Sequence, residues 1–181
     1  MISGNGYHLS SIKSNNKYMK PLTTALILLF ATTFATAQEG YTAEQEGWLV
    51  SIEEAYQESK ETGKPVMANF TGSDWCGWCK RLAAAVFVKP EFKEWAEENV
   101  VLLELDFPRR KKLPDNIRQQ NYSLQQQFGV RGYPTIWVFD IEMEDGQYNV
   151  TPIGKTGYRP TVQEFISGVN QMLERSEQKG G

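Results

Sequence analysis

This chain of 181 residues contains few cysteines and histidines, and its net charge is small. The chain contains two cysteines and a single histidine, His8, and its formal net charge is only −3. A structural zinc site needs four ligands, which these residues do not supply. The small negative charge gives no electrostatic reason to expect a nucleic-acid partner. We therefore expect neither a metal site nor nucleic-acid binding.

A long hydrophobic run is also missing, even from the N-terminal segment, residues 1–37. This segment has three lysines and no acidic residue, then an apolar stretch over residues 22–35, and it ends in Ala-Thr-Ala. A membrane-spanning helix needs about 18 continuous apolar residues, whereas threonines interrupt this stretch. The pattern predicts a secretory signal peptide cleaved near the bond between Ala37 and Gln38, with an uncleaved membrane anchor as the alternative.

Export would make the protein periplasmic or secreted, in a bacterial cell envelope. Removing the three lysines of residues 1–37 leaves 16 basic against 22 acidic side chains, a mildly acidic surface that favours solubility. No cysteine lies near the cleavage site, so we expect no lipid anchor and no membrane contact after cleavage. A second natural start at Met19 would make residues 1–18 a mis-annotated extension.

The remaining sequence alternates short apolar runs with helical patterns. Strands are expected at residues 48–50, 65–70, 100–106, 135–139 and 148–153, with an Asp-Gly turn before the last. Helices are expected at 51–63, from 76 past 85, from 90, at 123–128 and at 161–173, with a polar loop or loosely helical insertion at 107–121. This order predicts an α/β domain over residues 47–175, with a central mixed β-sheet flanked by helices. Residues 38–46 are expected to form a flexible lead-in, and residues 176–181 a disordered tail.

Both cysteines, Cys76 and Cys79, occur where a buried strand is followed by a helix. A helix that begins at Cys76 directs its unpaired N–H groups and positive dipole end at the first sulfur, which favours a thiolate. Cys76 would then attack a substrate disulfide, and Cys79 would resolve the mixed disulfide. This chemistry requires a first sulfur that solvent can reach.

Two simpler interpretations of the cysteine pair compete with exchange chemistry. A purely structural disulfide of this spacing closes too small a loop to add much stability. An idle reduced pair does not suit an oxidising compartment outside the cytoplasm. Thiol–disulfide exchange is therefore the favoured interpretation.

The segment 70–80, Phe-Thr-Gly-Ser-Asp-Trp-Cys-Gly-Trp-Cys-Lys, resembles the active-site segment of the thioredoxin superfamily. It is most similar to small exported bacterial members with a Thr-Gly-Ser-Asp-Trp-Cys lead-in. The similarity spans about residues 48–173, and the Trp-Cys-x-x-Cys-Lys core is specific once it follows a buried strand. The resemblance implies a thioredoxin fold and a redox-active Cys76–Cys79 disulfide.

Residues 132–135, Gly-Tyr-Pro-Thr, resemble the loop in which this family carries a cis-proline opposite the cysteines. A cis bond would let the backbone of Tyr133 pair with an extended substrate segment, and Pro134 would remove an N–H beside the sulfurs. An ordinary trans-proline at the start of a strand is the alternative. We expect Trp75 and Trp78 to contact substrate as well, although Trp75 also suits simple packing.

Two positions depart from the thioredoxin pattern. Trp78 replaces the proline common between the cysteines, and Asn69 replaces a buried aspartate on the preceding strand. Because asparagine cannot ionise, deprotonation of Cys79 would depend on solvent or another group, and Glu104 and Asp106 are the candidates. For both carboxylates, ordinary solvent exposure is the favoured alternative.

The cations near and beyond the cysteines have two interpretations each. Lys80 would support the Cys76 thiolate electrostatically, or point to solvent as most helix cations do. The run at residues 109–112, Arg-Arg-Lys-Lys, is the densest in the chain. A solvated loop is its default interpretation, and a docking patch for an acidic partner is the alternative.

The sequence as a whole predicts a protein thiol–disulfide oxidoreductase, with the reductase direction slightly favoured. Its expected partners are proteins with thiols or disulfides and an unidentified redox partner, and it is expected to be a monomer. No cofactor is expected, because the disulfide itself carries two electrons. A binding or chaperone-like module without redox turnover is the alternative, and a disulfide isomerase is a third possibility.

Overall fold

The computed structural model describes residues 41–180. The predicted signal peptide, residues 1–37, lies outside the described residues, as do residues 38–40 of the predicted lead-in. Within the described part of the chain, no helix combines the length and hydrophobicity needed to cross a bilayer.

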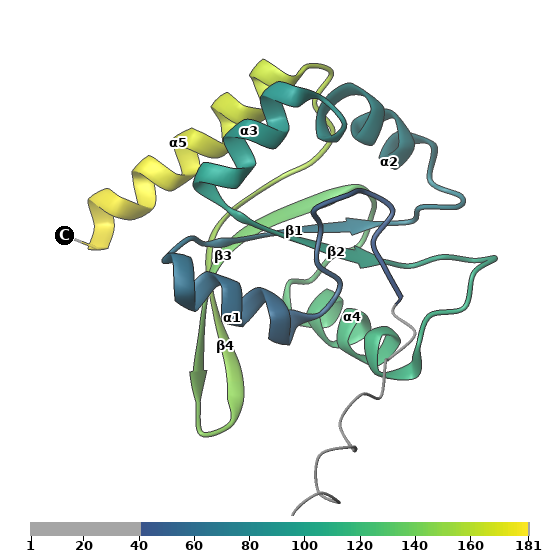
Figure 1. Cartoon of the computed structure of the whole chain (residues 1–181), viewed down its shortest axis with the longest axis horizontal. Helices are drawn as coiled ribbons and strands as arrows, with labels where there is room; N and C mark the ends of the chain where they lie inside the picture. The colour runs from purple at the N-terminus through teal and green to yellow at the C-terminus, as the bar shows by residue number, and fades with distance from the viewer. Residues whose placement is uncertain (1–40, 181) are drawn as a thin grey trace, which may run out of the picture. The chain divides into compact units, whose positions relative to one another are not determined.

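A four-stranded mixed sheet in the order β2-β1-β3-β4 forms the centre of the fold (Figure 1). Its strands are β1 Val66–Thr71, β2 Val101–Asp106, β3 Thr135–Glu144 and β4 Gln147–Thr156. β1 pairs in parallel with β2 and antiparallel with β3, and β3 pairs antiparallel with β4. The predicted α/β architecture with a central mixed sheet is therefore confirmed.

Helices cover both faces of the sheet, as Figure 1 shows. They are α1 Ile52–Thr62, α2 Gly77–Leu82 with the π-helical turn η1 Ala83–Phe87, α3 Pro90–Asn99, α4 Asp115–Gln127 and α5 Val162–Gly180. One core joins α2, η1, α3 and α5 to the sheet, and a second joins α1 and α4 to its other face. Every residue of β1 is buried, so the loop at its end emerges from the middle of the molecule.

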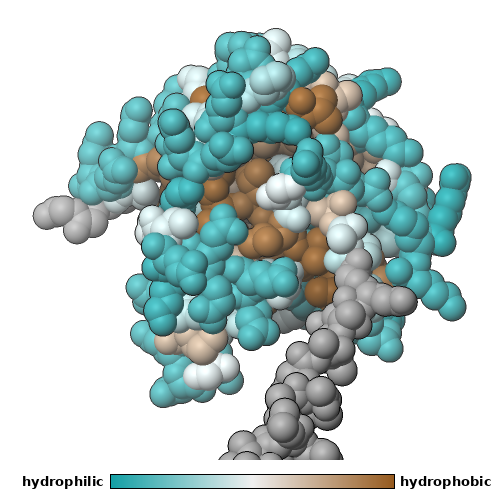
Figure 2. All heavy atoms as spheres, viewed as in Figure 1, coloured by the Kyte–Doolittle hydropathy of each residue, from teal (hydrophilic) through white to brown (hydrophobic). Residues whose placement is uncertain are grey.

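Figure 2 shows mainly hydrophilic residues on the face in view, with hydrophobic ones gathered near its centre. The buried apolar side chains lie in the two cores between the helices and the sheet.

Helix α1 has the two ends that the sequence predicts. The Ser51 hydroxyl accepts a hydrogen bond from the Glu54 N–H at 3.4 Å, as expected of an N-cap. Gly63 ends the helix with a φ of 72°, a left-handed conformation that favours glycine.

The predicted strand at residues 48–50 is wrong. Leu49 forms only an isolated parallel bridge with Leu103. Gly47 precedes this segment with a φ of 82°, and the α1 cap at Ser51 follows it. Too few extended residues remain between them for a strand.

Residues 107–121, predicted as a loop or a loosely helical insertion, form a loop followed by a regular helix. Helix α4 begins at Asp115 rather than Ser123. Ile117, Asn121 and Leu124 are its buried residues, and their helical spacing lets one side pack on the sheet. The polar composition that suggested a loop belongs to the exposed side of this helix.

The last elements are longer than predicted. β3 and β4 extend as a hairpin around Asp145 and Gly146, whose φ values of 50° and 77° fit the predicted two-residue turn. Helix α5 continues to Gly180 and covers most of the predicted tail, 176–181. Its final turns contain good helix formers such as Glu, Gln, Arg and Lys and no proline.

Candidate active site

Cys76 and Cys79 form a disulfide at the start of α2, with their Cα atoms 5.3 Å apart. Cys76 is the N-cap residue, and the Cys79 N–H donates to its sulfur at 3.2 Å. A backbone donor at a helix start stabilises negative charge on the sulfur after reduction. The predicted position of the pair at a helix start is confirmed.

The two cysteines are more enclosed than the sequence predicts. Cys76 is 6% exposed and Cys79 is 5% exposed, whereas exchange chemistry led us to expect a freely reachable first sulfur. Exchange begins when a thiolate attacks one sulfur of the pair, so a partner must reach the sulfur through the little surface that Cys76 exposes. A partner must fit closely to use it.

The Tyr133–Pro134 peptide bond is cis, as predicted. The Tyr133 ring packs edge-on against the ring of Trp75, with centroids 5.8 Å apart. Residues more than fifty positions apart in the sequence therefore meet beside Cys76. The proline loop and the cysteine loop form one surface.

Trp75 is fixed on several sides. Its indole N–H donates to the Phe107 carbonyl oxygen at 2.9 Å, and the Arg109 guanidinium lies 3.9 Å from its ring centroid. Gly72 lies against the same ring, because a Cβ atom at this position would come within 2.5 Å of Trp75 Cε2. The packing role predicted for Trp75 is thus present, and Gly72 is a supporting residue that the sequence analysis missed.

Trp78 is 53% exposed, so its ring is accessible to a partner. Its ring packs against Tyr158 at a centroid distance of 4.9 Å and lies 4.7 Å from the Arg81 guanidinium. The neighbouring Lys80 is exposed, and its ammonium group donates to the Asp74 carbonyl oxygen at 3.2 Å. Lys80 therefore points to the loop that precedes Cys76.

Asn69 lies on β1 and is 6% exposed. It lines a cavity of about 400 Å³ together with Cys79. Its side-chain oxygen has no hydrogen-bond partner among residues 41–180. Asn69 is thus near the second cysteine, as the resemblance implies, and offers a polar group to this cavity.

Glu104 and Asp106 are buried, with exposures of 3% and 0%, so the favoured prediction of exposed carboxylates is wrong. The register of β1 and β2 aligns Glu104 with Asn69 and Asp106 with Thr71. Burial raises the pKa of Glu104 to about 7, opposed by a hydrogen bond from the Glu44 N–H and reinforced by Asp106. The pKa of Glu104 therefore lies well above that of an exposed glutamate.

Asp106 has its own partners. Its carboxylate accepts hydrogen bonds from the Ser73 N–H at 2.8 Å and the Ser73 hydroxyl at 2.5 Å. Lys111 lies 3.6 Å from the same carboxylate and also pairs with Glu44. These contacts satisfy a charge that would be costly to bury alone.

Part of the predicted flexible lead-in belongs to this cluster. The Glu44 N–H donates to Glu104 Oε1 at 3.0 Å, and Ala43 packs against the core. The sequence carried no signal for these contacts, because residues 41–46 are mostly polar and lack a clear period. Only the fold brings them beside β2.

Asp74 is a second supporting residue that the sequence analysis missed. Its carboxylate accepts hydrogen bonds from the N–H groups of Arg109, Arg110 and Lys111 at 2.6–3.3 Å. Partial desolvation raises the pKa of Asp74, but these three bonds outweigh it and hold the pKa below its usual range. Asp74 thereby ties the basic loop, residues 109–112, to the active-site loop.

Metal binding has no candidate in the part of the chain that the structure describes. No group of three or more His, Cys, Asp or Glu side chains in residues 41–180 is arranged to hold an ion.

Residues 52–165 match a family model described as the thioredoxin-like domain. The disulfide bond reductase DsbH of Chlamydia pneumoniae is 38% identical over 92 residues, which cover 51% of this chain and 55% of that protein. The thioredoxin-related protein DsbJ of the same organism is 33% identical over 126 residues, which cover 70% of this chain and 36% of that protein. The chain thus spans about half or less of the length of these curated relatives.

Two solved structures share the fold. A DsbH oxidoreductase superposes with a TM-score of 0.61 at 28% identity, covering 75% of this chain and 92% of that one. A thioredoxin from Thermus thermophilus gives a TM-score of 0.52 at 20% identity, covering 72% and 89%. The predicted thioredoxin fold is therefore confirmed.

Proposed function

The chain belongs to the thioredoxin-like domain family, and from this premise we propose that it is a protein thiol–disulfide oxidoreductase that acts through Cys76 and Cys79. One observation carries the proposal: the two sulfurs are joined at the start of α2, with Cys76 as the N-cap. The Tyr133 loop packs beside them through Trp75. This arrangement supports thiolate attack on one sulfur while the substrate lies as an extended segment along the Tyr133 loop.

In the reducing direction, the Cys76 thiolate attacks one sulfur of a substrate disulfide. A mixed disulfide forms, and the substrate's other sulfur leaves as a thiolate that takes up a proton. Cys79 loses its proton and attacks the Cys76 sulfur, which releases the reduced substrate. Two electrons have passed to the substrate, and the protein is left with the Cys76–Cys79 disulfide. An external dithiol donor must then restore the reduced pair.

The name of the relative DsbH, a disulfide bond reductase, supports the reducing direction. Under this proposal, Trp75, Trp78, Tyr133 and Pro134 contact substrate. Lys80 and Asn69 tune the pair, and Glu104, which is aligned with Asn69 across β1 and β2, receives the Cys79 proton. No dissociable cofactor takes part in these steps.

We propose that the reaction takes place in the periplasm or outside the cell. The signal-peptide pattern of residues 1–37 supports export. The substrates would be exported proteins with disulfides, the donor an envelope redox partner, and the enzyme itself a monomer.

The insulin-reduction assay with dithiothreitol tests the function. We expect the wild-type protein to accelerate the appearance of turbidity from reduced, precipitating insulin. The variant Cys76→Ala should lose this acceleration, because no mixed disulfide can form. Equal turbidity in both would favour the alternative, a binding module without turnover. The small exposure of Cys76 is the observation that favours that alternative.

The reduction potential tests the direction of transfer. Known proteins of this chemistry range from about −270 mV for reductants to about −120 mV for oxidants. We expect a value in the reducing half. Equilibration with glutathione measures it, and a value above about −150 mV would contradict the reductase direction.

A further inference from the structure

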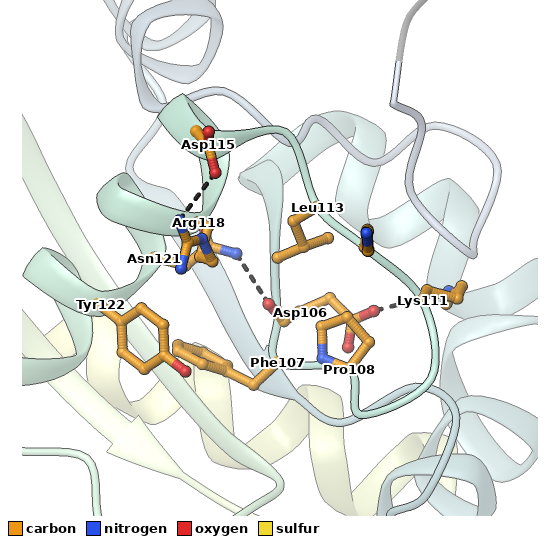
Figure 3. Close-up of a pocket in the computed structure, with 10 residues that line it drawn as sticks. Asp106, Phe107, Pro108, Lys111, Leu113, Asp115, Arg118, Asn121 and Tyr122 are labelled. Carbon is orange, nitrogen blue, oxygen red and sulfur yellow. Dashed lines mark hydrogen bonds and ion pairs between the residues drawn. The ribbon is translucent and has the colours of Figure 1, made fainter.

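A groove runs between the loop after β2 and the start of α4, next to the active-site loop (Figure 3). Its volume is about 370 Å³. Phe107, Pro108, Leu113 and Tyr122 give it an apolar wall. Tyr122 is 51% exposed, and its ring packs edge-on against Phe107 at 5.5 Å. An exposed aromatic side chain in a groove is available to a partner.

Positive charge gathers around this groove, although the chain is acidic overall. Arg109, Arg110 and Lys112 of the basic loop are exposed, and none forms an ion pair with another residue in the 41–180 range. The nearby carboxylates are already engaged: Asp106 and Asp74 by the contacts described above, and Asp115 by Arg118 at 2.8 Å.

The start of α4 adds to the positive potential. Its N-cap residue, Pro114, provides no side-chain hydrogen bond. The first turn therefore has no side-chain cap for its N–H groups, and its one acidic residue, Asp115, is paired with Arg118. A carboxylate of a bound partner would be stabilised there.

The basic loop is fixed next to the cysteines rather than being a free surface loop. Asp74 binds three of its N–H groups. Trp75, directly before Cys76, donates to Phe107 and stacks with Arg109. A polypeptide whose disulfide lies at Cys76 thus passes close to both the loop and the groove.

We propose that the basic loop and this groove dock an acidic segment of the protein substrate next to its disulfide. Carboxylates of the segment pair with Arg110 and Lys112, and an apolar side chain packs against Tyr122. The inference rests on the proposed function and adds a substrate preference to it. Charge complementarity of this kind mainly raises the rate of association.

The test compares three disulfide-bonded peptides that differ only beside the cysteine: Asp-Asp-Leu, Lys-Lys-Leu or Ser-Ser-Leu. Reduction by the full chain, with dithiothreitol as the electron donor, is followed by chromatographic separation of the reduced from the oxidised peptide, and the rate with dithiothreitol alone is subtracted. We expect kcat/KM about tenfold higher for the acidic than for the basic peptide at low salt, and a smaller ratio at high salt. The double variant R110E/K112E should remove or reverse the preference, through KM rather than kcat.

The control K60E/K89E makes the same change in net charge on α1 and before α3, outside the groove, and should leave the preference intact. Tyr122→Ala should weaken binding of all three peptides through the shared leucine. Circular dichroism checks that each variant is folded.

Equal rates for the three peptides in wild type would overturn the docking proposal while leaving the oxidoreductase function in place. If K60E/K89E lost the preference for the acidic peptide as R110E/K112E does, the docking proposal would also be overturned, because net charge would then be the cause. Absence of reduction of every peptide would overturn both. A fourth outcome is that the protein co-sediments with phosphatidylserine vesicles, that this binding requires Arg110 and Lys112, and that no peptide is preferred. This outcome would overturn the docking proposal and would indicate that the loop binds a lipid surface.

Discussion

At the scale of single residues, the polar groups beneath the disulfide have the largest consequences. Glu104 and Asn69 are neighbours across β1 and β2, and both are buried on a face that is otherwise mostly apolar. A thioredoxin-type buried aspartate on β1 is absent, and an acid on the adjacent strand is present instead. The ionisable side chain of this pair thus lies on β2, and the asparagine lies on β1.

Glu104 should make folding stability depend on pH. Its pKa of about 7 in the folded state exceeds the unfolded value of about 4.3. The folded state therefore binds more protons between these two values, and stability falls as pH rises through this window. The loss is on the order of 4 kcal/mol, taking about 1.4 kcal/mol for each pKa unit.

Urea unfolding of the oxidised protein at pH 5 and at pH 8 measures this effect. The variant Glu104→Gln keeps an acceptor for the Glu44 N–H and should flatten the difference between the two pH values. Glu91→Gln, at an exposed position on α3, is the control. It should keep the wild-type difference in unfolding free energy between pH 5 and pH 8. A wild-type protein equally stable at both pH values would contradict the prediction.

Gly72 should tolerate no side chain. In Gly72→Ala, the new Cβ would meet the Trp75 ring at 2.5–2.8 Å, so the ring must shift. We expect a loss of about 1–3 kcal/mol in unfolding free energy and a change in tryptophan fluorescence.

The matched control for Gly72 is Gly168→Ala within α5, where a Cβ meets nothing within 4 Å. It should stabilise the protein by about 0.5–1 kcal/mol, because alanine favours a helix interior over glycine. If the two variants had equal stability, steric contact with Trp75 would not be the controlling effect.

At the scale of elements, the loop between β2 and α4 is held by a side chain that precedes it by more than thirty residues. The Asp74 carboxylate accepts hydrogen bonds from three backbone N–H groups of this loop. An N-cap side chain accepts from backbone N–H groups at a helix start in the same way. The basic loop therefore keeps a defined shape although it is polar and exposed. Asp74 supplies three of the hydrogen bonds that hold it, beside the contacts of Trp75 with Phe107 and Arg109 and those of Lys111 with Glu44 and Asp106.

Asp74→Ala should release the basic loop. Trypsin cleaves after Arg and Lys, so residues 109–112 should become a preferred site in the variant, while the folded wild type should be cut there slowly. Mass spectrometry of the first fragments measures this. Asp74→Asn, which keeps one acceptor oxygen, should fall between the two, and unchanged cleavage in Asp74→Ala would contradict the prediction.

At the scale of the whole molecule, the fold places chemistry from distant segments at one edge of the sheet. Cys76 follows β1, the basic loop follows β2, and Pro134 precedes β3, which runs antiparallel to β1. The C-terminal ends of β1 and β2 therefore lie beside the start of β3. This arrangement brings the cysteine pair, the basic loop and the cis-proline loop together at one edge of the sheet.

Export of the whole chain is predicted from residues 1–37. Expression of the full chain in a bacterium should yield a periplasmic or secreted product whose N-terminus lies near Gln38. Ala37→Glu should block cleavage, because the site requires a small residue, and intact-mass measurement distinguishes the two forms. A wild-type product that keeps residues 1–37 would contradict the signal-peptide prediction.

The sequence by itself determined the elements with strong local signals. The apolar runs of β1 and β2, the caps of α1 and the Asp145-Gly146 turn all follow from neighbouring residues. The site cysteines were found in the same way, because their spacing and their place after a buried strand are local features.

Only the tertiary structure decided which polar groups are buried and which segments meet. The burial of Glu104 and Asp106, the near-enclosure of Cys76 and the contacts of residues 41–46 depend on partners far away in the chain. The physical reason is that the free energy of a charge depends on its surroundings in space. Local pattern predicts a residue's element, but a carboxylate's environment is set by every segment that packs on it.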